Sequence, residues 1–236
     1  VVLADAATFV AAAGLAWSLR GSTAVPAAAR RRPALTPLRD HRYMVVTGLS
    51  AVLAAHRSLL TLGVPLVVVT SASVPRALVP LLLTLNIAAS VLLQVRAARA
   101  SSTVRGAAVT FRRAGLALTL CCVALATAGR APWPLALTLL VLAVMGQTGA
   151  ELWQSAAGWE VSYALARPDQ QAVYLSIYGL AVAGETVYGP AVVGAVVASG
   201  PSLGWLALGA VLAGVGLAAP WLVRWAAGDR WEGVPA

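Results

Sequence analysis

The stretch LALTLLVLAVMGQTGAELWQSAA, residues 135–157, decides the fold class of this chain. It carries a single charge, Glu151, and it is long enough for a helix to cross the hydrocarbon core of a bilayer, which takes roughly 20 residues. The apolar residues do not alternate with polar ones, and Ala, Leu and Gly are frequent, so a lipid-facing barrel strand is excluded. The stretch therefore predicts a transmembrane helix.

The composition of the whole chain points the same way. Of the 236 residues, 60% are hydrophobic and 11% are charged, and the mean hydropathy is +0.82. Soluble domains are about half apolar and about a quarter charged. The chain has eight acidic and 17 basic side chains, and the basic ones are all arginine. These are too few charged groups to cover the water-exposed surface of a globular domain of this size. The chain is therefore expected to be an all-α polytopic membrane protein, and an ordinary cytosolic enzyme or a disordered tail is excluded.

Seven apolar runs are candidates for transmembrane helices. They cover residues 1–19, 44–69, 76–95, 114–128, 135–157, 172–199 and 203–225. The fourth run is short, and we expect its helix to include residues 110–113 as well. No loop between the runs is large enough to be a separate domain, so any function must reside among the helices.

The arginines between these runs predict the orientation. Fourteen of them fall on one side of the membrane and two, Arg76 and Arg130, on the other. Because basic residues concentrate on the cytoplasmic side, the start of the chain is expected outside and its end in the cytoplasm. The net charge of +9 does not indicate a nucleic-acid partner, since the arginines lie in short clusters between apolar runs.

The segment 20–43 divides the chain into one helix and a block of six. It is rich in Pro and Arg and has no apolar periodicity, so it is expected to be a cytoplasmic linker lying against anionic lipid headgroups. The predicted organisation is a lone helix at 1–19, this linker, a six-helix bundle at 44–225 and a cytoplasmic tail at 226–236. Because the chain begins inside an apolar run, we expect it to be a fragment of a longer protein.

Two charged residues fall near the middle of predicted spans, Arg57 and Glu185. A charge at that depth is costly and is by default a functional hypothesis. We expect Arg57 and Glu185 to attract each other across the interior, or Glu185 to be protonated. The alternative for Arg57 is a structural role in binding carbonyls at helix ends.

Further polar residues follow helical stripes in the same block. Gln147 and Glu151 are four residues apart and share a face, and Tyr178 lies seven residues before Glu185 on another. Asn86 and Gln94 are expected to form hydrogen bonds between helices. For Glu151 an interfacial role is an equal alternative, and for Tyr178 the alternative is helix packing with a satisfied hydroxyl.

No catalytic motif is present in the sequence. There is no GxSxG, no HExxH and no glycine-rich phosphate loop, and without a lysine neither a Walker motif nor a retinal Schiff base can form. The only cysteines, Cys121 and Cys122, are adjacent and have no zinc-ligand spacing, so we expect them to fill apolar space. We therefore expect no enzyme activity, no cofactor and no metal site.

Three stretches resemble the C-terminal portion of a major facilitator superfamily transporter, of the drug-efflux-like kind found in actinobacteria. LTLNIAASVLLQVRAAR, residues 83–99, is similar to the eighth helix of that family running into a basic inner loop. ALARPDQQAVYLSIYGLA, residues 164–181, is similar to the loop before helix eleven, and GPAVVGAVV, residues 189–197, to the Gly-Pro turn within it. The lone first helix and the basic linker resemble helix six and the central loop.

The resemblance implies half of a carrier in the plasma membrane of a bacterium, whose two six-helix halves rock around a site at the midplane. It implies a missing N-terminal half as partner, a small organic substrate and coupling to protons, with Glu185 or Glu151 as carrier. The implied residues of the substrate or proton pathway are Arg57, Asn86, Gln147, Glu151, Tyr178 and Glu185.

Two other classes share the predicted layout. A seven-helix receptor or sensor has the same orientation, but the usual receptor signatures at the inner ends of the third and seventh spans are absent. A half-size porter that dimerises also has seven spans, but the Pro-Gln motif of small sugar porters is missing. An aromatic-lined face with few charges suits amphipathic molecules and sugars equally, so the sequence does not identify the substrate.

Overall fold

The computed structural model describes residues 36–71, 74–200 and 202–228. Its regular elements in this part of the chain are all helical. They are, in order, η2 (Thr36–Arg39), α2 (His41–Leu53), α3 (His56–Ser58), η3 (Leu59–Gly63), α4 (Val64–Thr70), α5 (Leu78–Ala100), α6 (Val104–Ala128), α7 (Trp133–Leu165), η4 (Pro168–Gln170), α8 (Gln171–Ala183), α9 (Glu185–Ala198) and α10 (Leu203–Ala227).

Six helical segments are long and apolar enough to cross a membrane. They are His41–Thr70, Leu78–Ala100, Val104–Ala128, Trp133–Leu165, Pro168–Ala198 and Leu203–Ala227. The predicted all-α architecture is confirmed, and six of the seven predicted spans correspond to these segments. The first predicted span, most of the linker 20–43 and all but three residues of the tail lie outside the described residues.

The fourth predicted span was too short at its start. The helix begins at Val104, where the side chain of Thr103 caps it by accepting a hydrogen bond from Gly106 N at 3.0 Å. Arg112 and Arg113 lie within the helix and are exposed. Long arginine side chains can reach the membrane surface while their helix continues, so the charges did not mark the end of the helix.

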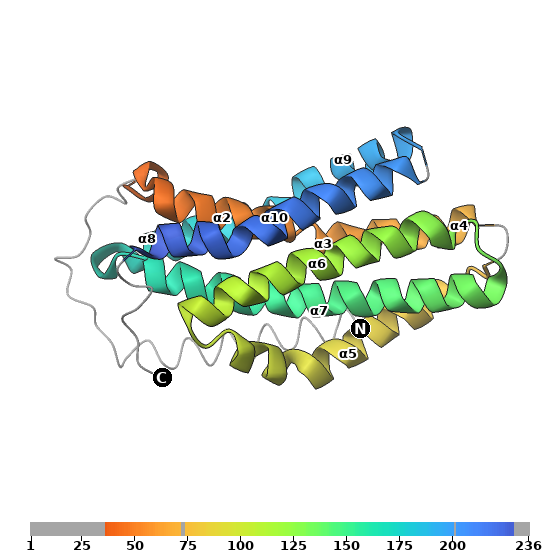
Figure 1. Ribbon diagram of the computed structural model, residues 1–236, viewed down its shortest axis with the longest axis horizontal. Helices are drawn as coiled ribbons and strands as arrows, with labels where there is room; N and C mark the ends of the chain where they lie inside the picture. Colours follow the sequence, from red (N-terminus) through yellow and green to blue (C-terminus); the bar gives the residue numbers. More distant parts are fainter. Residues whose placement is uncertain (1–35, 72–73, 201, 229–236) are drawn as a thin grey trace, which may run out of the picture. The chain divides into compact units, whose positions relative to one another are not determined.

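The helices run lengthwise side by side in a bundle (Figure 1). Helix α6 packs most extensively against α7 and α10. Gly115 permits the close contact with α10, because a Cβ placed on it would lie 2.8 Å from the carbonyl oxygen of Leu212. Small residues of this kind let membrane helices approach closely.

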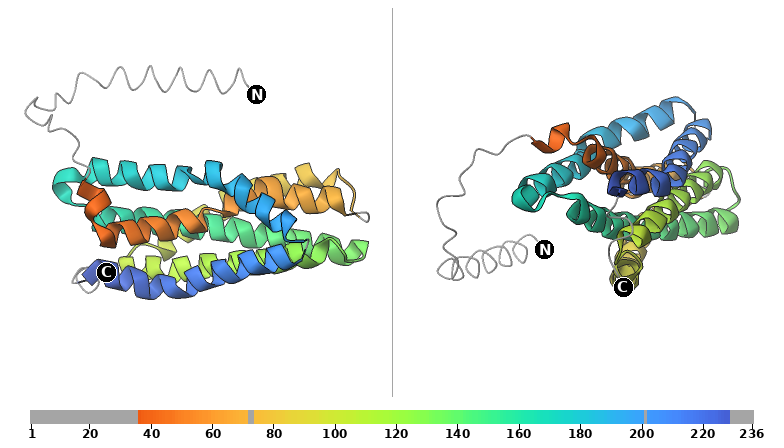
Figure 2. Two further views of the ribbon diagram at one scale, coloured as in Figure 1. Left: turned by 90° about the horizontal axis from the view of Figure 1, so that it is seen from above. Right: turned by 60° about the vertical axis from the view of Figure 1, so that its left-hand side comes forward.

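Helix α5 lies at the edge of the bundle and packs mainly against α7 (Figure 1 and Figure 2). Five of its large exposed side chains are apolar. They are Leu81, Ile87, Val91, Leu92 and Val95. Leu180 of α8 and Val187 of α9 are exposed as well. So much exposed apolar surface is uncommon on a soluble monomer and is typical of a membrane or protein interface.

The arginines gather at one end of the bundle, at the left in Figure 1. The described arginines at or near that end are Arg39, Arg42, Arg96, Arg99, Arg105, Arg112, Arg113, Arg167 and Arg224. Arg76 and Arg130 belong to the turns at the opposite end. We refer to the two ends as the arginine-rich end and the arginine-poor end.

Two of the six segments are interrupted near their middles. The first described segment breaks after α2 at Ala54 and Ala55 and continues through the π-helix η3. The fifth breaks at Gly184, between α8 and α9. Pro190 lies inside α9, and the interruption comes earlier in the chain, directly before Glu185.

Candidate functional site

The candidate site lies around the break at Ala54 and Ala55 in the helical segment His41–Thr70. In a regular α-helix each backbone N–H donates to the carbonyl four residues earlier. Here Ala55 N donates to Val52 O at 3.2 Å and Arg57 N to Ala54 O at 3.1 Å, each a spacing of three. The backbone groups beside this break need partners from outside the helix, because a bilayer offers none.

Glu185 supplies the partner of one amide at the break. Its Oε1 atom accepts a hydrogen bond from Ser58 N at 3.0 Å and another from the Ser58 hydroxyl. The side chain is only 2% exposed. Since Glu185 is the first residue of α9, this carboxylate joins the interruption of the fifth segment to that of the first.

Two further side chains bind the carbonyl groups on the other side of the break. Gln154 of α7 donates from Nε2 to Ser50 O at 3.3 Å, and the hydroxyl of Tyr188 on α9 donates to Ala51 O. Both carbonyls also accept from Ala54 N within the helix, at 3.0 and 3.1 Å. Three side chains from α7 and α9 therefore contact the break, and that of Glu185 supplies the partner of Ser58 N.

Glycines make these approaches possible. A Cβ at Gly189 would collide with the Ser58 hydroxyl and with the Glu185 carboxylate, and a Cβ at Gly158 would collide with the hydroxyl of Tyr178. Tyr178 is 2% exposed and lies edge-on to Trp159 at 5.2 Å between ring centroids. The structure therefore places Tyr178 in the packed layer between α7 and α8.

Arg57 does not form the expected ion pair with Glu185. Its side chain is exposed, whereas its neighbours His56 and Ser58 are buried, and within the described residues the only ion pair joins Arg167 to Asp169. Ser50 is buried, although it lies only seven residues before the exposed Arg57. The break between them alters the regular rotation per residue that would place both on one face of a helix.

The charge of Arg57 still belongs to this region. Its exposed side chain follows the break at Ala54–Ala55, and Glu185 is buried against Ser58, the next residue. Arg57 thus presents a cation on the exposed side of the break, and Glu185 an acid on its buried side.

A second polar cluster links α5 to α7 and adjoins the break. Asn86 donates from Nδ2 to Gln147 Oε1 at 3.1 Å, to Thr148 Oγ1 at 2.9 Å and to Glu151 Oε2 at 3.4 Å. Gln147 Nε2 lies 3.4 Å from Glu151 Oε2 and 3.5 Å from His56 Nδ1. Hydrogen bonding between helices is confirmed for Asn86, whereas the side chain of Gln94 is exposed. The cluster reaches α3 through His56.

Two buried polar atoms beside the break have no hydrogen-bond partner, Ser50 Oγ and His56 Nε2. Buried polar atoms without partners are rare in folded proteins and call for an explanation. Both belong to the residues that flank the interruption, so this region is not locked into a single fully satisfied arrangement.

The structure joins three of the six predicted pathway residues, Asn86, Gln147 and Glu151, by hydrogen bonds. Glu185 is buried at the break, and Arg57 is exposed beside it without pairing with Glu185. Tyr178 packs beside them. Sequence reasoning missed Ser58 and Thr148, because an isolated hydroxyl residue gives no signal in an apolar run; only a contact from another helix shows its role.

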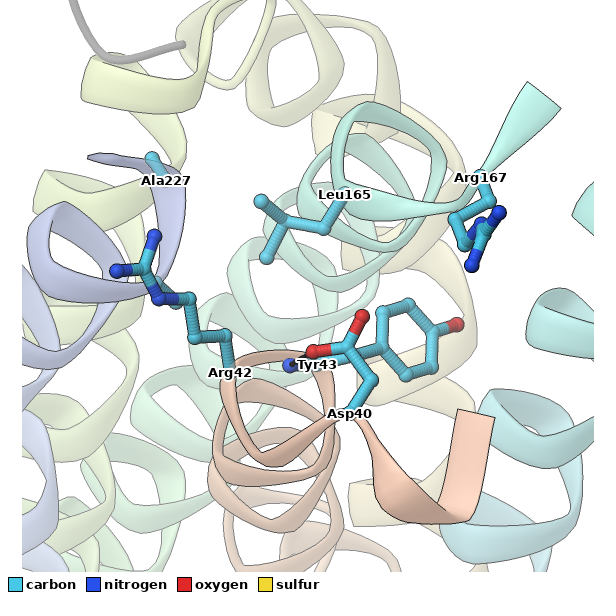
Figure 3. Close-up of a pocket in the computed structure, with 7 residues that line it drawn as sticks. Asp40, Arg42, Tyr43, Leu165, Arg167 and Ala227 are labelled. Atoms are coloured by element: carbon cyan, nitrogen blue, oxygen red, sulfur yellow. Dashed lines mark hydrogen bonds between the residues drawn. The ribbon is translucent and has the colours of Figure 1, made fainter. Parts of the chain in front are cut away.

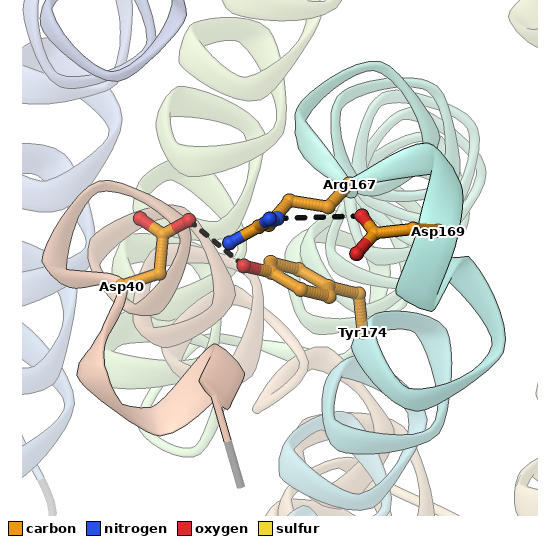
Figure 4. A network of polar contacts seen from close by, with 4 residues as sticks. All are labelled: Asp40, Arg167, Asp169 and Tyr174. Carbon is orange, nitrogen blue, oxygen red and sulfur yellow. Dashed lines mark hydrogen bonds and ion pairs between the residues drawn. The ribbon is translucent and has the colours of Figure 1, made fainter. Parts of the chain in front are cut away.

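A separate polar network ties the helices together at the arginine-rich end. Asp40 caps α2 by accepting from Tyr43 N at 3.2 Å, and it also accepts from the Tyr174 hydroxyl at 3.1 Å (Figure 4). Tyr43 in turn donates to Tyr174 O at 2.7 Å. The start of α2 and the first turn of α8 are therefore joined by three side chains.

A cavity of about 290 Å³ opens beside this network between α2, the end of α7 and the end of α10. Figure 3 shows Arg42 and Arg167 on opposite sides of it, with Asp40 and Tyr43 between them. Arg167 pairs with the exposed Asp169 at 3.4 Å. With acids and bases intermixed, this cavity has no clear preference for one sign of charge.

The residues that the structure describes contain no cluster of three or more His, Cys, Asp or Glu that could hold a metal ion. Cys121 and Cys122 are buried free thiols. The chemistry available at the break is therefore that of one buried carboxyl group, one exposed guanidinium and several amide and hydroxyl groups. Such a set can bind polar ligands and can take up or release a proton.

Comparison with known proteins identified no relative. No protein-family model, no curated protein and no solved structure matches the chain.

Proposed function

We propose that this chain is part of a secondary transporter that moves a small organic molecule across a membrane by alternating access. The observation that carries the proposal is the meeting of two interrupted helices at Glu185. Irregular backbone in the middle of a membrane is tolerated where it is buried in protein or lines a polar cavity. Transporters use such broken helices to form binding sites near the midplane.

The exposure of Arg57 supports a partner for this half-bundle. A guanidinium near the middle of an apolar helix is unfavourable against lipid. Arg57 is exposed, and Glu151 on α7 is half-buried. A second bundle that covers them would turn this face into a polar cleft. We assign that role to the N-terminal half of a carrier resembling the major facilitator superfamily; a second copy of the chain is the alternative.

Glu185 is proposed to carry the coupling proton. As a carboxylate it can only accept hydrogen bonds, and it accepts two from Ser58. When a proton binds to it, the group becomes neutral and can donate as well. The hydrogen bonds from Ser58 are then no longer assisted by a negative charge. Charge-assisted hydrogen bonds are about twice as strong as neutral ones. Protonation would thereby loosen the contact that joins the two breaks.

Orientation and location follow from the same proposal. With the arginine-rich end in the cytoplasm, the described helices obey the preference of basic residues for that side. We place the chain in the plasma membrane of a bacterium, as the family resemblance implies.

Proton-driven flux tests the proposal. The chain and the N-terminal half that we assign to it are reconstituted together into vesicles. Accumulation of an amphipathic fluorescent dye such as ethidium is then followed under an imposed pH gradient. We expect gradient-driven accumulation to be abolished in Glu185→Gln, while dye exchange without a gradient persists.

Glu160→Gln is the matched control, since Glu160 lies on α7 with no contact to the break, and it should transport as the unmodified protein does. Unchanged gradient-driven transport in Glu185→Gln would remove Glu185 from the mechanism. Loss in Glu151→Gln alone would assign the proton to Glu151.

A further inference from the structure

The arginine-poor end contains a cavity of about 320 Å³ that the transport proposal does not use. It lies where α4, α6, α9 and α10 meet. This volume is at the lower end of the range of ligand pockets, roughly 300–1,000 Å³. The cavity is therefore large enough for part of a small or chain-like ligand.

The walls of this cavity are mostly apolar. Leu66, Leu125, Val197 and Trp205 contribute to them. Leu125 and Trp205 are buried, while Val197 is 48% exposed and marks the mouth. The indole of Trp205 lies against Gly63, since a Cβ on that glycine would be 2.8 Å from the ring. The interior of the cavity thus suits a hydrocarbon segment.

A single cation stands among these apolar walls. Arg130 follows the end of α6 and donates from Nη1 to the Ser202 hydroxyl, which itself donates to Ala126 O at 3.1 Å. A guanidinium has five N–H donors, and no acidic residue among the described ones pairs with Arg130. Most of its donors are therefore free to bind an anionic oxygen.

The charge balance at the arginine-poor end also favours an anionic ligand. The acidic residues in the described part of the chain are Asp40, Glu151, Glu160, Asp169 and Glu185. None of them belongs to the turns at the arginine-poor end. Among the described residues, Arg130 and Arg76 thus have no acidic counterpart at that end, which favours a negatively charged ligand.

We propose that this cavity binds an anionic amphiphile, with a hydrocarbon segment in contact with Trp205 and an acidic head group on Arg130. The chemistry fits a fatty carboxylate and the phosphate of an anionic phospholipid alike. Arg130 lies just beyond the end of a helix, at the depth where lipid head groups lie, so the ligand can enter from the membrane.

Quenching of tryptophan fluorescence tests this inference on the full chain in lipid nanodiscs. Bromine quenches an indole only at close range, so a dibrominated stearate added to the discs should cause saturable quenching. Trp205→Phe should remove the saturable part, which assigns it to the cavity. A second arm replaces the added acid with brominated phosphatidylglycerol. Brominated phosphatidylcholine, which has no net charge, serves as the control for this arm.

Arg130→Gln should weaken the binding of the probe about tenfold, the loss expected for charge-assisted hydrogen bonds of roughly 1.5 kcal/mol. Arg76→Gln is the matched control, because Arg76 is at the same end and does not line the cavity, and it should leave binding unchanged. Equilibrium dialysis of radiolabelled stearate gives a readout that does not depend on Trp205.

Saturable quenching that depends on Arg130 supports the proposal, and the arm in which it occurs identifies the free acid or the phospholipid as its source. Quenching that is not saturable, that Arg76→Gln weakens as much as Arg130→Gln, or that phosphatidylcholine produces equally would overturn it.

Discussion

Gly189 is the residue on which the contact between the two interrupted segments most directly depends. Its missing side chain makes room for the Ser58 hydroxyl and the Glu185 carboxylate. We predict that Gly189→Ala lowers the free energy of unfolding by about 1–3 kcal/mol, the usual cost of overpacking. Thermal unfolding in detergent measures it.

The control for this change lies on the same helix. A Cβ on Gly194 meets nothing within 4 Å, and alanine is favoured over glycine in a helix interior by roughly 0.5–1 kcal/mol. Gly194→Ala should therefore be neutral or slightly stabilising. Equal destabilisation by both substitutions would show that Gly189 has no special role at the break.

At the residue scale, the sequence indicated which polar groups matter but not how they pair. The costs of burying Asn86, Gln147 and Glu185 are properties of the residues and their depth, so they could be recognised in advance. The pairing of Glu185 with Ser58 instead of Arg57 could not, because it depends on a turn at Ala54–Ala55 that no proline or glycine announces.

At the scale of elements, Asn86 joins α5 to α7 by side-chain hydrogen bonds. We predict that Asn86→Ala lowers the free energy of unfolding by about 1 kcal/mol, as measured for polar contacts between membrane helices. The reason is that Gln147 and Thr148 lose a buried partner. Reversible unfolding in mixed detergent micelles measures this.

Gln94 offers the comparison on the same helix. Its side chain is exposed, so Gln94→Ala should change the stability by a few tenths of a kcal/mol at most, as surface substitutions do. If Asn86→Ala proves equally harmless, then the cluster with Gln147 is not what holds α5 in place.

The boundaries of the elements show where periodicity stops being informative. Apolar runs identified six helices, since length and hydropathy decide whether a helix fits a bilayer. They failed at the start of α6, where exposed arginines lie inside a helix, and at Gly184, where an interruption falls within an unbroken apolar run. Helix breaks are fixed by contacts between helices, which one sequence does not display.

At the scale of the whole molecule, the two ends of the described bundle are predicted to face opposite sides of the membrane. Cys121 and Cys122 are buried, so their replacement by alanine gives a background without thiols. Ser102→Cys at the arginine-rich end should react with a membrane-impermeant maleimide only from the cytoplasmic side. Ser199→Cys at the other end should react only from outside.

The reversed pattern in intact cells and inverted vesicles would show that the arginine distribution misled the assignment of sides. Labelling of both positions from one side would mean that the three helical segments between them do not all span the membrane as proposed. The asymmetry of the arginines is a property of the sequence, and the structure adds that the described ones other than Arg57 lie at or near the ends of the helical segments.

The central claim is that Glu185, held at the junction of two broken helices, takes up and releases the coupling proton. Infrared difference spectroscopy between alkaline and acidic buffer observes this directly, because a carboxyl group gains a characteristic C=O band when it is protonated. We predict a band that is present in the unmodified protein, persists in Glu160→Gln and is missing in Glu185→Gln. An identical difference spectrum in Glu185→Gln would contradict the claim, since Glu185 would then not change its protonation at all.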